Sequence, residues 1–307
     1  MRVLVVGLGV QGQKRRSVAG DEVVGIVDPF HKDAQYSVIQ DVPLDIYDAA
    51  LLCIPDDPKI EIIEYLLAKS KHVLVEKPLF AACASDLLRI KELAEKNRTA
   101  CYTAYNHRFE PHFVRMREII SSERLGRIYS VRIFYGNGTA RLVRESAWRD
   151  QGASVLTDLG SHLLDTLSFW FGRNFTDFSI HSANCFENLA IDHVNFGVNA
   201  NPLIQLEATF LSWRNHFYCD LFAEHGSAHI TSLCKWGPSS FVLRDRKLPS
   251  GRPDEESITL IQSDLTWLAE YKYFKELCKK GVNNIDNDIW INDTLTNLSA
   301  NLNSKKG

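Results

Sequence analysis

The 307-residue sequence lacks the features that mark several large classes of protein. No apolar run approaches the length of about 20 residues that a membrane-spanning helix needs. A formal net charge of -3 provides no basic field that would attract nucleic acid or an anionic membrane. Repeats and low-complexity segments are missing, apart from a polar stretch at 301–307. We therefore expect a globular protein without nucleic-acid or membrane partners.

The seven cysteines include no Cys-x-x-Cys pair. An odd number of scattered cysteines is typical of reduced thiols and favours a cytoplasmic location. His225 and His229 have His-x-x-x-His spacing, but Gly226 and Ser227 favour a turn there, so the two rings would not converge on one ion. We predict no metal site. The short apolar run of residues 3–6 ends in glycine, which is typical of a strand and not of a signal peptide.

The first third of the chain alternates between apolar runs and helical spacing. We predict strands at residues 3–6, 22–27, 49–54, 72–75 and 100–104, and helices at 10–18, 60–68 and 87–94. Strands that alternate with helices form crossover units, and such units build a parallel sheet that is buried on both faces.

The pattern changes after residue 127. Alternating or continuous apolar runs then predict strands at 128–134, 178–182, 193–198, 204–211 and 217–223, with helices at 159–171 and 265–278. This combination predicts an α+β domain with a largely antiparallel, open sheet. We place the domain boundary near Tyr105, so that the second domain covers residues 106–307.

A glycine-rich loop follows the first predicted strand directly and opens the first predicted helix. Its G-x-G-x-x-G pattern allows a tight turn, a close approach of the backbone to a pyrophosphate, and close packing of helix on strand. The helix N-terminus would face the negative charge. The pattern predicts a Rossmann dinucleotide-binding domain over residues 1–105. The expected contacts are Gly7, Gly9, Val10, Gln11 and Gly12.

Asp28 follows the second predicted strand, where an acid can accept hydrogen bonds from the adenosine ribose. A carboxylate there would repel a 2′-phosphate, so NAD is favoured over NADP. Alternatively, Asp28 and Pro29 only begin a turn. Lys14, Arg15 and Arg16 keep NADP as the minor alternative, although such residues more often form a solvated helix face.

The segment Lys71–Pro78 is a predicted strand that ends in Glu76, Lys77 and Pro78. Packing explains a lysine poorly at the carboxyl end of a buried strand, where ligands of parallel sheets bind. The segment resembles the Glu-Lys-Pro signature of the glucose–fructose oxidoreductase, inositol dehydrogenase and MocA family (Gfo/Idh/MocA). Further matches occur in family order, over roughly residues 1 to 175: Tyr105-Asn106-His107-Arg108-Phe109, Gly126-Arg127-Ile128, Trp148-Arg149, and Thr157–Asp165, which is similar to Asp-x-Gly-x-His-x-x-Asp.

The resemblance implies a Rossmann domain followed by a domain with an open sheet, whose free face often forms an oligomer interface in relatives. It implies that Lys77, Asp158 and His162 are the catalytic group. It also implies cofactor contacts and substrate contacts. The implied cofactor contacts beyond the glycine loop and Asp28 are Ile54, Pro55, Glu76, Lys77 and Asn106, and the implied substrate contacts are Lys77, Tyr105, Trp148, Arg149, Asp158 and His162.

Two segments depart from the family pattern. The family often has Pro-Asn-x-x-His after the third strand, whereas this chain has Pro55-Asp56-Asp57-Pro58-Lys59. The usual Gly-Gly-Gly is Gln151-Gly152-Ala153. Neither change touches the implied catalytic residues, but the first alters two cofactor-side contacts and both bear on the shape of the pocket.

The chemistry of alcohol oxidation suits the three implied catalytic residues. An imidazole is a suitable base for a hydroxyl proton, which assigns that role to His162. Asp158, four residues earlier, would lie on the same helical face and orient the ring or a substrate hydroxyl. Lys77 can donate to the reacting oxygen. The non-catalytic interpretations are a structural histidine, a helix N-cap at Asp158 and a surface lysine.

Several neighbouring residues receive smaller roles. We expect Asp165 to cap or pair locally, and His107 to form part of a pocket wall. The arginines at 141, 144 and 149 either form a solvated loop or recognise a phosphate or carboxylate on the substrate.

The sequence therefore predicts an NAD-dependent oxidoreductase that moves a hydride between nicotinamide and a secondary hydroxyl of a sugar, polyol or sugar derivative. A narrower alternative is a nucleotide-sugar dehydrogenase of surface-polysaccharide synthesis. The sequence is also compatible with a non-catalytic dinucleotide sensor and with a reductase of unsaturated or cyclic imines. We expect a homo-oligomer, either dimer or tetramer, because nothing else in the chain would cover the open sheet.

Overall fold

The structure is a computed structural model that describes residues 1–81 and 83–304. The chain divides into two compact units. The first contains Met1–Asn106 and Thr266–Asn292, and the second contains His107–Leu265 and the residues from Asp293 onward. The first unit is thus larger than the predicted first domain, because a segment near the end of the chain returns to it.

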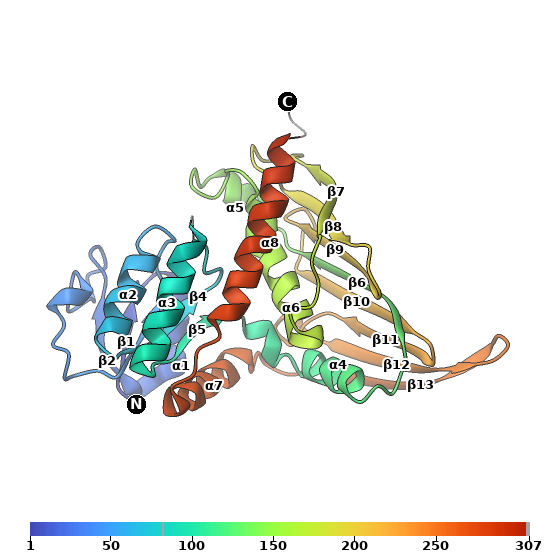
Figure 1. Cartoon of the computed structure of the whole chain (residues 1–307), viewed down its shortest axis with the longest axis horizontal. Coiled ribbons are helices and arrows are strands. Elements are labelled where there is room, and N and C mark those ends of the chain that lie inside the picture. The colour runs from blue at the N-terminus through green and yellow to red at the C-terminus, as the bar shows by residue number, and fades with distance from the viewer. Residues whose placement is uncertain (82, 305–307) are drawn as a thin grey trace. The chain divides into compact units, whose positions relative to one another are not determined.

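The first unit contains a five-stranded sheet in the order β2-β1-β3-β4-β5 (Figure 1). All four strand pairs are parallel, which confirms the predicted parallel sheet. The chain leaves β1 toward β2 on one side and continues with β3 on the other, so the strand order reverses between β1 and β3. Its elements are β1 (Val3–Val6), α1 (Val10–Ala19), β2 (Val23–Val27), β3 (Ala49–Leu52), α2 (Lys59–Ala68), β4 (His72–Glu76), α3 (Ala84–Asn97), β5 (Cys101–Ala104) and α7 (Thr266–Lys280).

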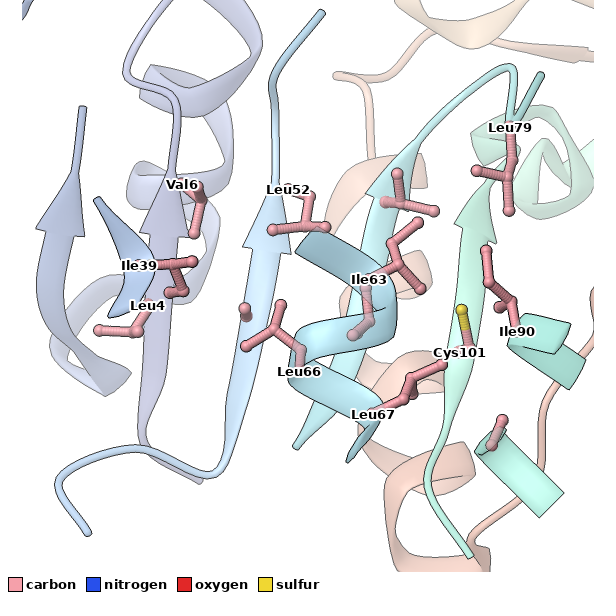
Figure 2. Close-up of a cluster of buried hydrophobic side chains, with 14 of the residues drawn as sticks. Leu4, Val6, Ile39, Leu52, Ile63, Leu66, Leu67, Leu79, Ile90 and Cys101 are labelled. Atoms are coloured by element: carbon pink, nitrogen blue, oxygen red, sulfur yellow. The ribbon is translucent and has the colours of Figure 1, made fainter. Parts of the chain in front are cut away.

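Strand residues of the first sheet alternate between two buried faces, as the period of two in a strand requires. Leu4 and Leu52 point to the face that α2 and α3 cover, where they meet Ile63 and Leu66 (Figure 2). Each such side chain, fully removed from water, contributes about 1.5–3 kcal/mol.

The opposite face of the first sheet carries Val3, Val5 and Leu51, which cluster with Tyr271 and Phe274 of α7. The apolar spacing of residues 265–278 predicts this helix. The sequence pattern does not predict that the helix packs on the sheet formed by the first third of the chain.

The second unit contains an eight-stranded sheet in the order β13-β12-β11-β10-β6-β9-β8-β7 (Figure 1). Only β6 and β9 pair in parallel, and the other pairs are antiparallel, which confirms the predicted sheet type. The strands are β6 (Ile128–Gly136), β7 (Ser179–Asn184), β8 (His193–Val198), β9 (Leu203–Thr209), β10 (His216–Ala223), β11 (Gly226–Thr231), β12 (Ser239–Lys247) and β13 (Gly251–Leu260).

Helices cover one face of this second sheet. Phe113 of α4 (Pro111–Ser121) packs between Phe217 of β10 and Trp170 of α6 (Ser161–Phe171). The indole of Trp170 donates to the Phe113 carbonyl at 3.0 Å. The second unit also contains the short α5 (Ala140–Arg144). The helix α8 (Ile285–Ser304) begins in the first unit, which extends to Asn292, and its later residues belong to the second. None of the helices within 1–81 and 83–304 is both long and apolar enough to cross a membrane.

The other face of the second sheet carries both aromatic and charged side chains. Phe134 and Tyr218 stack with ring centroids 5.2 Å apart. Arg132 is exposed on the same face, with its guanidinium 5.9 Å from the Tyr218 ring. The face is therefore less apolar than the open face expected from the sequence, and the homo-oligomer stays a prediction.

A buried carboxylate organises the loop between β7 and β8. Asp192 has no exposed surface and accepts backbone hydrogen bonds from Phe186, Glu187 and Asn188 at 2.6 to 3.1 Å. The Asn188 amide in turn donates to the Ala140 carbonyl at 2.9 Å. Asp192 thus supplies the acceptor for three consecutive N–H groups of the loop.

We predict that Asp192→Ala lowers the free energy of unfolding by about 3 kcal/mol, because it leaves three N–H groups of the loop without their acceptor, one of them buried. Urea denaturation followed by fluorescence measures this change. Glu187→Ala, an exposed acid of the same loop, is the matched control and should change the free energy by less than about 0.5 kcal/mol. Equal effects of the two substitutions would contradict the prediction.

Candidate active site

The carboxyl ends of the first unit's parallel strands all lie at one edge of the sheet, and every predicted cofactor residue ends one of these strands or follows it. The glycine loop follows β1, Asp28 follows β2, and Ile54 and Pro55 follow β3. Glu76 ends β4 and precedes Lys77, and Asn106 follows β5. This edge is where open α/β sheets bind ligands, at the point where the strand order reverses.

The glycine loop has the geometry that a pyrophosphate site requires. Gly7 has φ 85°, and a side-chain carbon there would lie 2.5 Å from the Cys53 carbonyl oxygen. A side-chain carbon at Gly12 would lie 1.9 Å from the Gly7 carbonyl oxygen, so helix and loop can pack only on glycine. A side-chain carbon at Gly9, by contrast, would have no atom of the described residues within 4 Å.

The N-terminus of α1 is open to an anionic ligand. Gly9 is its N-cap residue, no side chain of the described segments caps it, and its first turn contains no acid. Val10 and Gln11 are exposed at this end of the helix. The N–H groups of a first helical turn and the helix dipole together attract negative charge. The loop therefore fits the phosphates of a dinucleotide.

Asp28 binds the glycine loop as well as the turn that follows β2. Its Oδ2 accepts from the Leu8 N–H at 2.7 Å, and its Oδ1 accepts from the N–H groups of Phe30 and His31 at 2.9 and 3.0 Å. Burial acts against the charged form, but these backbone hydrogen bonds prevail and lower the pKa of Asp28. An ionised carboxylate in this position can still accept from a ribose hydroxyl, because Oδ2 retains a lone pair.

Arg15 is buried and is not part of a solvated helix face. Its side chain is 1% exposed, with Nε 2.6 Å from Glu76 Oε1 and Nη1 2.7 Å from Glu270 Oε2. The Trp267 ring lies 4.3 Å from its Cζ. Lys14 and Arg16 remain exposed. The interpretation of Arg15 as a solvated residue is wrong, because two carboxylates and an aromatic ring replace its water.

One guanidinium serves two carboxylates in this cluster. Burial raises the pKa of Glu270 to about 7, and the second carboxylate, Glu76, acts in the same direction. Arg15 opposes both effects, and the Tyr102 hydroxyl donates to Glu270 Oε1 at 3.4 Å. Because a single positive charge is shared between two negative ones, protonating Glu270 relieves the excess negative charge.

Two predicted contacts beside β5 are buried in the first unit. Asn106 donates from Nδ2 to the Thr266 hydroxyl at 2.8 Å, at the start of α7. Tyr105 is buried as well. Lys77 is half-buried.

In the second unit, His162 lies in a cluster of rings. It belongs to the first turn of α6, and its ring stacks on His107 with centroids 4.1 Å apart and planes 20° apart. The Tyr135 ring lies edge-on at 5.8 Å. Burial raises the pKa of Tyr135, so its hydroxyl stays protonated. His107 thus forms a wall on one side of the predicted base.

Asp158 lies inside a helical turn and is not an N-cap. The turn Leu156–Gly160 is π-helical and leads into α6, whose N-cap is Gly160. Single π-helical turns often occur at functional sites. Asp158 Oδ2 accepts from Arg149 Nη2 at 3.3 Å. The predicted substrate residues Asp158 and Arg149 therefore form an ion pair.

The other residues of this region that the sequence singled out differ in exposure and pairing. Trp148 is 69% exposed. Asp165 is buried and accepts from Arg108 through both oxygens at 2.6 to 3.0 Å, which is the local pairing expected for it. Arg141 and Arg144 are exposed on α5.

Lys235 and Trp236 are two residues beside the ring cluster that the sequence does not single out. Both lie on a short helical turn, Cys234–Trp236, between β11 and β12. Lys235 Nζ lies 3.4 Å from His107 Nε2 and 4.7 Å from the Trp236 ring centroid, and Trp236 lies 5.8 Å from Tyr135. No motif surrounds this pair in the sequence, so only the fold brings it to His107.

Comparison with known proteins agrees with this geometry. Residues 1–105 match the oxidoreductase family with an NAD-binding Rossmann fold, and residues 113–229 match the Gfo/Idh/MocA C-terminal domain. The chain belongs to the Gfo/Idh/MocA family.

Two curated relatives in this family match parts of the chain. The chain is 25% identical over 180 residues to the glucose-6-phosphate 3-dehydrogenase of Bacillus subtilis (strain 168). This match covers 54% of this chain and 51% of that protein. Over 143 residues it is 34% identical to inositol 2-dehydrogenase 1 of Saccharopolyspora erythraea, which covers 45% and 39%. The chain thus matches about half of the length of these relatives or less.

A solved structure extends the likeness to nearly the whole chain. UDP-N-acetylglucosamine 3-dehydrogenase from Acidithiobacillus ferrooxidans has a TM-score of 0.78 and covers 98% of this chain and 97% of its own. Sequence identity is 14%, so this likeness concerns the fold alone.

We predict that the charge of Glu270 makes stability depend on pH. The pKa of Glu270 is raised in the folded protein. Its contribution to the free energy of unfolding is therefore fully present below the ordinary carboxyl pKa and is lost as pH rises through about 7. Relative to Glu270→Gln, the wild type should lose on the order of 1–3 kcal/mol of unfolding free energy between about pH 5 and about pH 8.

Urea denaturation at a series of pH values measures this difference. Glu276→Gln is the matched control, because Glu276 lies on the same helix and is exposed. Its difference from the wild type should stay flat over this range. If the difference in unfolding free energy between the wild type and Glu270→Gln also stays constant with pH, the charge of Glu270 is not the cause of the pH dependence.

Proposed function

We propose that this chain is an NAD-dependent oxidoreductase that transfers a hydride between nicotinamide and a secondary hydroxyl of a sugar, polyol or sugar derivative. The observation that carries the proposal is the common edge of the parallel sheet, which bears the glycine loop, Asp28 and the Glu76–Lys77 pair. Membership of an NAD-binding oxidoreductase family supports it.

The residues at this edge suit the two ends of a dinucleotide. The open N-terminus of α1 would bind the pyrophosphate through backbone N–H groups, and Asp28 would accept from the adenosine ribose. The nicotinamide accepts or supplies the hydride. The remaining steps concern protons, which the chain's own side chains hold and move.

His162 is proposed to take the proton from the substrate hydroxyl. The rings of His107 and Tyr135 hold its imidazole from two sides, which restricts its orientation. Lys77, as an ammonium, is proposed to donate to the reacting oxygen and to stabilise the developing negative charge. Asp158 would hold a neighbouring substrate hydroxyl while Arg149 fixes its carboxylate.

Sugars and polyols are the proposed substrates because the named relatives act on glucose 6-phosphate and inositol. The structural neighbour named for UDP-N-acetylglucosamine supports a nucleotide-linked sugar as the narrower candidate. An NADH-production screen with myo-inositol, glucose 6-phosphate and UDP-N-acetylglucosamine compares the three classes. Absence of turnover with every compound of a wider sugar and polyol panel would favour the non-catalytic sensor.

We predict that the wild type binds NAD more tightly than NADP and that Asp28→Ala narrows this gap. Removing the carboxylate removes the repulsion of a 2′-phosphate, and it also frees the Leu8 N–H in the glycine loop. NAD affinity should therefore fall by about 10-fold, equivalent to about 1.4 kcal/mol. Fluorescence titration measures both dissociation constants, with the exposed Asp33→Ala as control. A wild type that binds NADP more tightly than NAD would contradict the role assigned to Asp28.

We predict that His162→Ala reduces turnover by about 10²- to 10⁴-fold and that Lys77→Ala reduces it by about 10²- to 10³-fold. NAD affinity should change by only a few-fold, because the adenosine half binds at the glycine loop and Asp28. His162→Ala should also lose the acidic limb of the rate–pH profile. His181→Ala, an exposed histidine of β7, should leave turnover unchanged. If His162→Ala retains near-normal turnover, His162 is a structural residue.

A further inference from the structure

Lys59 is a buried lysine at the start of α2, in the first unit. It is 3% exposed, although lysines are almost never fully buried unless they are paired. Its ammonium lies 2.6 Å from Asp56 Oδ1, 3.0 Å from the Glu76 carbonyl oxygen and 3.1 Å from the Pro78 carbonyl oxygen. An ammonium has three N–H donors, so these three acceptors account for all of them.

The two carbonyl groups belong to the residues on either side of Lys77. Lys59 therefore ties the backbone before and after Lys77 to the first turn of α2. Arg15 of α1 holds the same segment through the Glu76 side chain, at 2.6 Å. Two buried cations from two helices thus fix the tripeptide that contains Lys77.

A buried charge is a poor means of adding stability, because its desolvation offsets most of the attraction. An apolar side chain of similar length would fill the same space at lower cost. The geometry of Lys59 is better explained by the direction it imposes on the backbone carbonyls that it contacts. Asp56, whose side chain is 48% exposed, serves as its counterion at the surface.

We propose that Lys59, with Asp56 as counterion, is a positioning residue that sets the direction of Lys77 through the Glu76 and Pro78 carbonyls. This role rests on the proposed function, in which Lys77 donates to the reacting oxygen. Asp56 and Lys59 stand where the family often has asparagine and histidine. The two departures form one ion pair and act on the backbone beside Lys77.

Lys71 provides a matched control in the same unit. Its ammonium donates to the Tyr47 carbonyl at 2.9 Å and lies 5.0 Å from the Tyr47 ring. It is thus also a lysine bonded to a backbone carbonyl. It precedes β4, at the edge of the sheet opposite to Lys77. Lys71→Met should affect stability but not the segment around Lys77.

The first measurement is hydrogen exchange by mass spectrometry on the cofactor-free full chain. Lys59→Met should accelerate exchange in residues 76–81 by about 10-fold or more, because losing about 1.4 kcal/mol of local stability corresponds to a factor of 10. Lys71→Met should leave this segment unchanged. Lys59→Gln keeps an N–H donor for the carbonyls without a charge and should restore most of the protection. If Lys59→Met does not fold, Asp56→Ala takes its place, because it removes the counterion of Lys59 and should also accelerate exchange in residues 76–81.

The second measurement separates turnover from binding, with the best substrate of the screening panel and with NAD. Lys59→Met should reduce kcat by about 10- to 100-fold, the size expected for a misplaced group. The NAD dissociation constant should change by less than about 3-fold, and Lys59→Gln should recover most of kcat. Lys71→Met should retain wild-type kcat.

Three outcomes would overturn the proposal. If Lys59→Met does not change hydrogen exchange in residues 76–81, Lys59 does not hold this segment and the proposal loses its physical basis. Normal kcat in Lys59→Met, while Lys77→Ala is inactive, leaves the role of Lys77 intact and removes that of Lys59. Normal kcat in Lys77→Ala overturns the proposed role of Lys77 and, with it, the purpose of positioning that residue.

Discussion

The ion pairs of one guanidinium join three parts of the first unit that are far apart in the sequence. Arg15 comes from the helix that follows the glycine loop, Glu76 from the end of β4, and Glu270 from a helix near the end of the chain. The helix α7 therefore contributes a charge to the cofactor half of the protein as well as apolar packing. Since burial weakens the screening of these charges, a change in the charge of one carboxylate acts on the other.

A second constraint is the edge of the parallel sheet. Parallel strands end at the same edge of the sheet. Residues at the ends of five different strands therefore lie along one edge, although they are far apart in the sequence. In the second unit, the corresponding constraint is the stacking of His162 on His107. Residues 55 positions apart are brought together because the turn before α4 and the start of α6 pack on the same sheet face.

Most of the fold could be predicted from local patterns. Apolar runs indicated the five strands of the first sheet and β6 to β10 of the second, but not β11, β12 or β13. The glycine loop with Asp28 indicated the Rossmann domain. The prediction failed where the pattern was ambiguous. The strand β13 is polar on both faces, so its sequence has no apolar alternation, and Arg15 has a charged neighbour on each side, which suggested a solvated face.

The sequence by itself determined the alternation of strands and helices in the first sheet, the glycines that a close turn requires, and the residue types proposed for hydride transfer. Only the tertiary structure decided which charges are buried together. Lys59, Arg15 and Lys235 are ordinary lysines and arginines in the sequence. Their roles depend on distances to carbonyls, carboxylates and rings that come from other elements, and a Coulomb or hydrogen-bond contact acts over a few ångströms in space, whatever the separation along the chain.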